Sequence, residues 1–187
     1  MIGMERQREE QAIVLDFLQN GYPFDKRPSH VKTPVAQAIG FTNFSLLELV
    51  PRKEVRLRPL ERVYVGDDKR EKIHHVNGKI SYRKLTETAK SELKHTVKDM
   101  VLANEQRFIE FFNKAQPLNL RVHSLEMLPG VGKKHMREII DVREEELFKD
   151  FADFRARVKS VGDPVDKITN RIVSELEGNE KLNLFVR

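Results

Sequence analysis

A short run of proline and glycine, Pro129-Gly130-Val131-Gly132, most constrains what this chain can fold into. Leu125 and Leu128 precede it three residues apart, the spacing of one helix face, and Ile139 and Ile140 resume that periodicity after it. Two glycines around one apolar residue allow positive φ angles and let another molecule approach the backbone closely. The pattern therefore predicts two helices joined by a tight turn.

This turn also predicts a site for an anion. Its amide N–H groups lie at the start of the second helix, where unpaired donors and the helix dipole favour negative charge. Lys133 and Lys134 follow at once, and Arg137 lies about one turn further along. We expect the turn and these cations to bind a phosphate group. The alternative is a turn kept for packing, with the cations as ordinary solvated surface.

Residues 128–133 (the first hairpin) resemble the helix-hairpin-helix motif of DNA- and RNA-binding proteins, because the leucines, both glycines, the intervening valine and the later isoleucines fall in register. Met136 departs from the motif, which usually has a small residue at the helix crossing. The resemblance implies that backbone amides and a nearby lysine grip the sugar-phosphate backbone without reading bases. The candidate residues here are Leu128, Pro129, Gly130, Val131, Gly132, Lys133, Lys134 and Arg137.

Composition narrows the classes of function. With 187 residues, of which 39% are hydrophobic and 34% charged, the chain can bury a sizeable core in one domain or two. Its net charge of +5 favours an anionic partner. The absence of cysteine excludes disulfides, thiolate zinc sites and a cysteine nucleophile. No apolar run is long enough to span a membrane and no signal-peptide pattern begins the chain, so we expect a cytoplasmic protein without a membrane partner.

The first part of the chain predicts a small β domain. Residues 44–50 and 61–65 are apolar or β-branched runs, and Asn77-Gly78 between residues 72–76 and 79–83 is typical of a hairpin turn. Several short antiparallel strands favour a barrel, because closure removes exposed edges. Thr33-Pro34 predicts the start of a short helix over residues 35–39. Residues 12–18 fit a strand or a short helix equally well.

Positive charge concentrates in the predicted barrel. Residues 52–84 hold eleven lysines and arginines against five aspartates and glutamates, with Tyr64 and Tyr82 interleaved. A basic barrel with exposed aromatic rings is typical of folds that bind single-stranded nucleic acid, although both tyrosines fit a core equally well. The candidate residues on the barrel are Arg52, Lys53, Arg56 and Arg58.

The second part of the chain predicts helices. Helical spacing of apolar residues indicates one long helix over residues 86–114, which Pro117 ends. Val161-Gly162-Asp163-Pro164 (the second hairpin) predicts another tight turn, and a shift of 32 residues places Gly130 on Gly162. We expect this degenerate copy to be structural, because Pro164 lacks an amide donor and Asp163 is an acid.

These segments together predict an α+β chain of two domains. An oligonucleotide-binding-like small antiparallel β-barrel with a short helix covers residues 1–85, and a connecting long helix covers residues 86–117. An all-α tandem helix-hairpin-helix domain covers residues 118–187, with a β-prone tail at residues 182–186 that returns to the barrel. This order resembles an archaeal family of unknown function that is predicted to bind RNA or other nucleic acid.

Metal and catalytic sites are not expected. His74 and His75 are adjacent in a predicted strand and would point to opposite faces, so they could not share a metal ion. Asp150 and Asp153 lie where helix-hairpin-helix glycosylases place a catalytic aspartate, but their surroundings predict an amphipathic helix and its cap. The sequence shows no phosphate-binding loop of the P-loop type and no Ser-His-Asp arrangement. The other histidines, which show no ligand spacing, are His30, His95, His123 and His135.

Two functions remain. The first is a non-catalytic nucleic-acid-binding protein without a cofactor, with RNA favoured over DNA through the family resemblance, and with binding that weakens steeply as salt rises. The second is an adaptor that binds ribosomal or transcription proteins in a ribonucleoprotein or transcription assembly. The adaptor would use the hairpin domain and the phenylalanine stripe of residues 148–154 for protein contacts.

Overall fold

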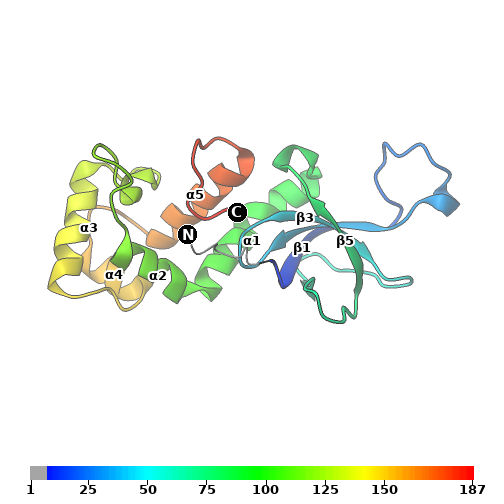
Figure 1. Cartoon of the computed structure of the whole chain (residues 1–187), viewed down its shortest axis with the longest axis horizontal. Coiled ribbons are helices and arrows are strands. Elements are labelled where there is room, and N and C mark those ends of the chain that lie inside the picture. Colours follow the sequence, from blue (N-terminus) through cyan, green and yellow to red (C-terminus); the bar gives the residue numbers. More distant parts are fainter. Residues whose placement is uncertain (1–7) are drawn as a thin grey trace, which may run out of the picture. The chain divides into compact units, whose positions relative to one another are not determined.

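The computed structural model describes residues 8–187. A five-stranded antiparallel sheet forms the centre of the N-terminal part of the chain (Figure 1). The strand order is β4-β1-β2-β3-β5, and each neighbouring pair is antiparallel. Within the described residues β4 and β5 do not pair with each other, so the sheet is a curled half-barrel, not a closed one. The strands are β1 (Gln11–Leu18), β2 (Val35–Gly40), β3 (Leu46–Pro51), β4 (Arg62–Tyr64) and β5 (Ile73–Lys79).

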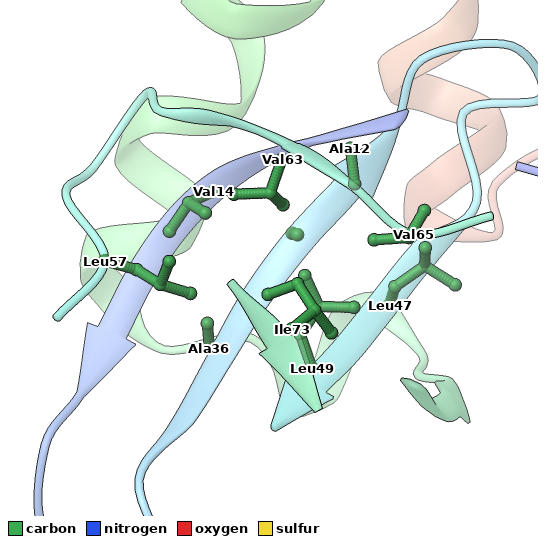
Figure 2. Packing of buried hydrophobic residues seen from close by; sticks show 10 residues of the cluster. Ala12, Val14, Ala36, Leu47, Leu49, Leu57, Val63, Val65 and Ile73 are labelled. Carbon is green, nitrogen blue, oxygen red and sulfur yellow. The ribbon is translucent and has the colours of Figure 1, made fainter. Parts of the chain in front are cut away.

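Alternating side chains fill the concave face of this half-barrel. Figure 2 shows that strands from both edges contribute to one apolar cluster, since Val63 of β4 and Ile73 of β5 belong to it together. The period of two along each strand brings these side chains to one face. Polar residues between them, such as Gln37 and its cross-strand partner Glu48, belong to the other face. The labelled members of the cluster are Ala12, Val14, Ala36, Leu47, Leu49, Leu57, Val63, Val65 and Ile73.

The expected helix over residues 35–39 is wrong, because these residues form β2. Both edges of β2 pair, with β1 on one side and β3 on the other, and all six of its residues are buried. Gln37 Nε2 donates to the Lys84 carbonyl over 2.8 Å, and Gln37 Oε1 accepts from the Thr86 amide over 2.8 Å. Pairing on both sides outweighs the local helix-start signal of Thr33-Pro34.

The expected hairpin at Asn77-Gly78 is also wrong. β5 runs through both residues, and the register places Gly78 opposite Glu48 and Val76 opposite Leu49. Asn77 is therefore the extra residue of a β-bulge, and Gly78 accommodates it with a φ of 141°. The Asn77 side-chain amide donates to Glu48 Oε1 over 2.6 Å, which fixes the bulge to β3.

The structure divides into two compact units. The first comprises the described residues up to Thr96 together with Glu175–Arg187, and the second comprises Val97–Ser174. The expected single long helix is two helices, α1 (Glu87–Ala103) and α2 (Glu105–Lys114). They are separated at Asn104, whose side-chain amide donates to the Met100 carbonyl over 3.1 Å. An asparagine side chain that competes for a helix carbonyl in this way favours a break.

The second unit is helical around an aromatic core. After α2 come the 3-10 turn η3 (Ser124–Met127), α3 (Lys133–Glu145), α4 (Phe151–Arg157) and α5 (Pro164–Glu177), the last of which ends in the first unit. The Phe154 ring centroid lies 4.5 Å from that of Phe112 and 4.8 Å from that of Phe148. The phenylalanines of residues 148–154 are buried, so this stripe is core and gives an adaptor no exposed surface.

The chain's last residues return to the first unit without forming a strand. Glu175 accepts hydrogen bonds from the amides of Leu184, Phe185 and Val186. The Arg187 carbonyl accepts from Ser45 Oγ over 2.8 Å. None of the helices in the described part of the chain is long and apolar enough to cross a membrane.

Candidate nucleic-acid interface

The first hairpin has the backbone that its glycines predict. Gly130 has a φ of 74°, a region that L side chains rarely adopt. The Val131 amide donates to the Leu128 carbonyl over 3.1 Å, and both side chains are buried. Gly132 then leaves the turn in an extended conformation as the N-cap of α3. The buried leucine and valine hold the turn to the core while the glycine backbone faces outward.

The start of α3 offers amide donors to an anion. The first intrahelical bond runs from the Met136 amide to the Gly132 carbonyl, so the amides of Lys133 and Lys134 have no acceptor within the helix. The Gly132 amide donates to His135 Nδ1 over 3.2 Å. A Cβ atom built on Gly132 would meet nothing within 4 Å, so a ligand can approach the backbone on this side.

Four cations surround this turn. Lys133, Lys134 and Arg137 are exposed, and within the described residues none of them forms a salt bridge. The fourth is Lys167 of α5, whose Nζ lies 2.9 Å from the position of a Cβ on Gly130. Sequence reasoning missed Lys167. The shift of 32 residues placed its neighbour Ile168 on Met136, but it did not show how α5 crosses the first hairpin.

The second hairpin has a similar turn but a different environment. Gly162 has a φ of 83°, and Asp163 Oδ1 accepts from the Val165 amide over 3.0 Å at the start of α5. The same carboxylate pairs with Arg155 over 2.9 Å. Glu138 of α3 accepts from the Lys159 amide over 2.9 Å and bonds the Ser160 hydroxyl. Carboxylates of the chain itself therefore accept from amides on both sides of this turn.

The basic candidates of the first unit lie together on the loop between β3 and β4. Arg52, Lys53, Arg56 and Arg58 are all exposed, while the buried Leu57 anchors the loop in the concave cluster. Glu61 accepts from the Lys72 ammonium and from the Arg58 amide, the latter over 2.9 Å, and these bonds, in that order, lower the pKa of Glu61. The four cations thus lie on one loop, which Leu57 and Glu61 hold in place and which belongs to a different unit from the first hairpin.

The tyrosines of the half-barrel are not part of its core. Tyr64 and Tyr82 are each half-buried. The Tyr64 hydroxyl accepts from the Asp68 amide over 3.2 Å, and the Lys90 ammonium lies 5.6 Å from the centre of the Tyr82 ring. Both rings remain partly accessible beside basic residues.

The adjacent histidines point the same way, contrary to expectation. His74 Nδ1 lies 2.7 Å from His75 Nδ1, because β5 has a second irregularity in which Val50 pairs with His75 and Pro51 with Ile73. His74 is the extra residue of this bulge, so the alternation of a regular strand does not apply. Even so, the part of the chain that the structure describes holds no group of three or more histidine, cysteine or acidic side chains able to bind a metal ion.

The two aspartates after the first hairpin belong to a helix cap. Asp150 Oδ1 accepts from the Asp153 amide over 2.7 Å at the start of α4. Asp153 Oδ2 in turn accepts from the Lys149 amide over 3.0 Å and pairs with Arg157 over 3.2 Å. Each carboxylate is engaged with the chain, as the cap predicted from the sequence requires.

A family model and two relatives match this chain, and none of the three is described with an activity. Residues 8–187 match the model of a family described as "Protein of unknown function (DUF655)". An uncharacterized protein of Methanocaldococcus jannaschii is 42% identical over 181 residues, which cover 96% of this chain and 80% of that protein. A crystal structure from Archaeoglobus fulgidus, of a protein assigned to the same family model, has a TM-score of 0.88 at 38% identity and covers 96% of this chain and 100% of that one. Both relatives are archaeal, as the resemblance of the whole sequence implied.

Proposed function

We infer that this chain, which belongs to the family described as "Protein of unknown function (DUF655)", is a non-catalytic nucleic-acid-binding protein. It grips the sugar-phosphate backbone through the first hairpin, a helix-hairpin-helix element, and through the basic loop of the half-barrel. RNA is favoured over DNA on the family resemblance of the sequence.

The observation that carries this proposal is the open, cation-lined turn at Gly130-Val131-Gly132. Its glycine backbone leaves room for a ligand, α3 begins there with unpaired amides, and Lys133, Lys134 and Lys167 add positive charge. Such a helix start favours a phosphate oxygen through both its donors and its dipole. Nothing in this arrangement selects a base, so binding is expected to be independent of sequence.

The proposal is tested by fluorescence anisotropy with labelled single-stranded RNA, duplex RNA and duplex DNA over a salt series. The protein should bind with an affinity that falls steeply between about 50 and 200 mM salt, because neutralised phosphates release counterions. Lys133→Ala/Lys134→Ala should weaken binding and reduce the slope of log K against log salt by about 1.4 for a single strand. Circular dichroism should show that the variant remains folded.

The matched control is Lys114→Ala/Lys149→Ala, which removes the same charge from two other lysines of the second unit. Lys114 pairs with Glu110 on α2, and Lys149 pairs with Glu146 in the segment between α3 and α4. It should leave the salt slope near that of the wild type. An equal loss in both double variants would mean that only net charge matters, and would contradict a site at the first hairpin. Salt-dependent binding that neither variant alters would move the site to residues 52–58, and no binding at low salt would overturn the proposal.

A further inference from the structure

An exposed aromatic ring stands on the loop between β1 and β2. In Figure 1 this loop extends beyond the ends of its two strands. Phe24 lies on it with 78% of its surface exposed, whereas the phenylalanines of the second unit's core are buried. One face of the Phe24 ring stacks on Tyr22, with ring centroids 5.0 Å apart and planes 14° apart. The other face is available to a ligand.

Tyr22 holds this ring in a fixed position on the sheet. The Tyr22 hydroxyl donates to Glu48 Oε2 over 2.5 Å and accepts from Gln37 Nε2 over 3.1 Å. Gln37 is fully buried and is itself bonded to the Lys84 carbonyl. Burial, followed by the bond to Glu48, raises the pKa of Tyr22 to about 12, so the hydroxyl keeps its proton and the bond at neutral pH. Phe24 therefore stacks on a pre-organised partner.

The charges around the ring suit phosphates. Asp25 is the one acidic residue between residues 21 and 34. Arg27 donates to its carboxylate through Nε over 3.0 Å and through Nη2 over 2.7 Å. This pairing lowers the pKa of Asp25 to about 2 and neutralises its charge. Lys26 and Lys32 form no salt bridge among the described residues, so they leave the loop with net positive charge.

We propose that the free face of Phe24 stacks an unpaired nucleobase of a single-stranded nucleic acid, while Lys26 and Lys32 attract the flanking phosphates. This inference rests on the proposed nucleic-acid-binding function and adds to it a preference for single strands. A flat ring with one open face, fixed from behind and flanked by cations, matches a nucleotide's base and phosphate together. Every base has a π-face, so the site tolerates any sequence.

The chain has no tryptophan, so Phe24→Trp would place a single fluorescent reporter at this site. Single-stranded oligoadenylate RNA should quench this tryptophan along the same curve that anisotropy gives for binding. The matched control is Leu147→Trp, at a position that is 60% exposed in the second unit, and it should not be quenched.

A second set of variants tests the ring by affinity. Phe24→Ala and Phe24→Leu should each weaken single-strand binding by about fivefold or more, because stacking needs an aromatic face, whereas Phe24→Tyr should retain it. The affinity for duplex RNA should not change. If RNA binds and the Lys133→Ala/Lys134→Ala variant weakens it, but Phe24→Trp stays unquenched and Phe24→Ala binds normally, base stacking is overturned and the proposed function stands. If no nucleic acid binds at low salt, both are overturned.

Discussion

The two hairpins of the second unit have similar glycine conformations, but they differ in whether a carboxylate of the chain accepts from the amides near the turn. Gly130 and Gly162 have φ angles of 74° and 83°, and a helix begins shortly after each. At the second hairpin, Asp163 caps α5 and Glu138 accepts from the Lys159 amide. At the first hairpin, the N-cap is a glycine, which has no side chain to offer.

This difference suggests how the same kind of turn can serve packing in one place and ligand binding in another. A helix start attracts negative charge, and a carboxylate of the same chain satisfies it permanently. Where the N-cap is Gly132, the same attraction is left for a ligand, and the cations around it are exposed. The presence or absence of an internal carboxylate, more than the turn itself, is then expected to decide whether the hairpin binds phosphate.

The strongest test gives the first hairpin the carboxylate of the second. Gly132→Asp should weaken nucleic-acid binding by about tenfold or more, because the new charge lies where a phosphate would bind. The extended conformation of Gly132 suits any residue, and a Cβ there meets nothing within 4 Å. The free energy of unfolding should therefore stay equal or rise by up to about 1 kcal/mol through capping.

The matched variant Gly132→Asn adds a capping side chain of the same size without its charge. Anisotropy and urea unfolding of both variants separate the two effects. If Gly132→Asp binds as tightly as Gly132→Asn, charge at this N-cap does not matter, and the contrast between the hairpins has no bearing on binding.

A smaller effect is expected from alanine at the two glycines with positive φ. Gly130→Ala and Gly162→Ala should each lower the free energy of unfolding by about 1–2 kcal/mol, because both force an L side chain into the left-handed region. Only Gly130→Ala should also weaken nucleic-acid binding, because its methyl group would lie 2.9 Å from Lys167 Nζ and displace that ammonium. A Cβ at Gly162 meets nothing within 4 Å. Urea unfolding and anisotropy measure the two effects, and equal losses of affinity would argue against a role for Lys167.

Local signals in the sequence predicted the two turns, but the helix expected before the first hairpin is only the 3-10 turn η3. A positive φ favours glycine, so Gly130 and Gly162 could be placed without knowing the fold. In the structure, the Asp163 side chain at the start of α5 and Gly178 after its end, with a φ of 78°, show the same short-range chemistry. The strands expected at residues 44–50 and 61–65 correspond to β3 and β4.

Features that depend on distant partners were not predictable in this way. β2 is a strand because β1 and β3 pair with it on both sides, and neither pairing is visible in Thr33-Pro34. The bulge at Asn77 depends on the register of β5 against β3, and a similar bulge turns His74 toward His75. Lys167 reaches Gly130 only because of the way α5 packs within the second unit. The periodicity of apolar residues predicts which face of a helix or strand is buried, but it does not predict which other element packs against that face.

The smallest expected effect is the acid sensitivity of the second hairpin. Hydrogen bonds from the Ser160 hydroxyl, and then from the Lys159 and Ser160 amides, lower the pKa of Glu138. A carboxylate with a lowered folded-state pKa stabilises the fold above its ordinary pKa of about 4.3, and this contribution is lost as the pH falls through the lowered value. Protection of the Lys159 and Ser160 amides against hydrogen exchange should therefore fall on acidification, while that of Val131, which donates to the Leu128 carbonyl, should not. Glu138→Gln should reproduce the loss at neutral pH. An equal fall in protection at both hairpins would mean that acid loosens the whole unit and that Glu138 is not the cause.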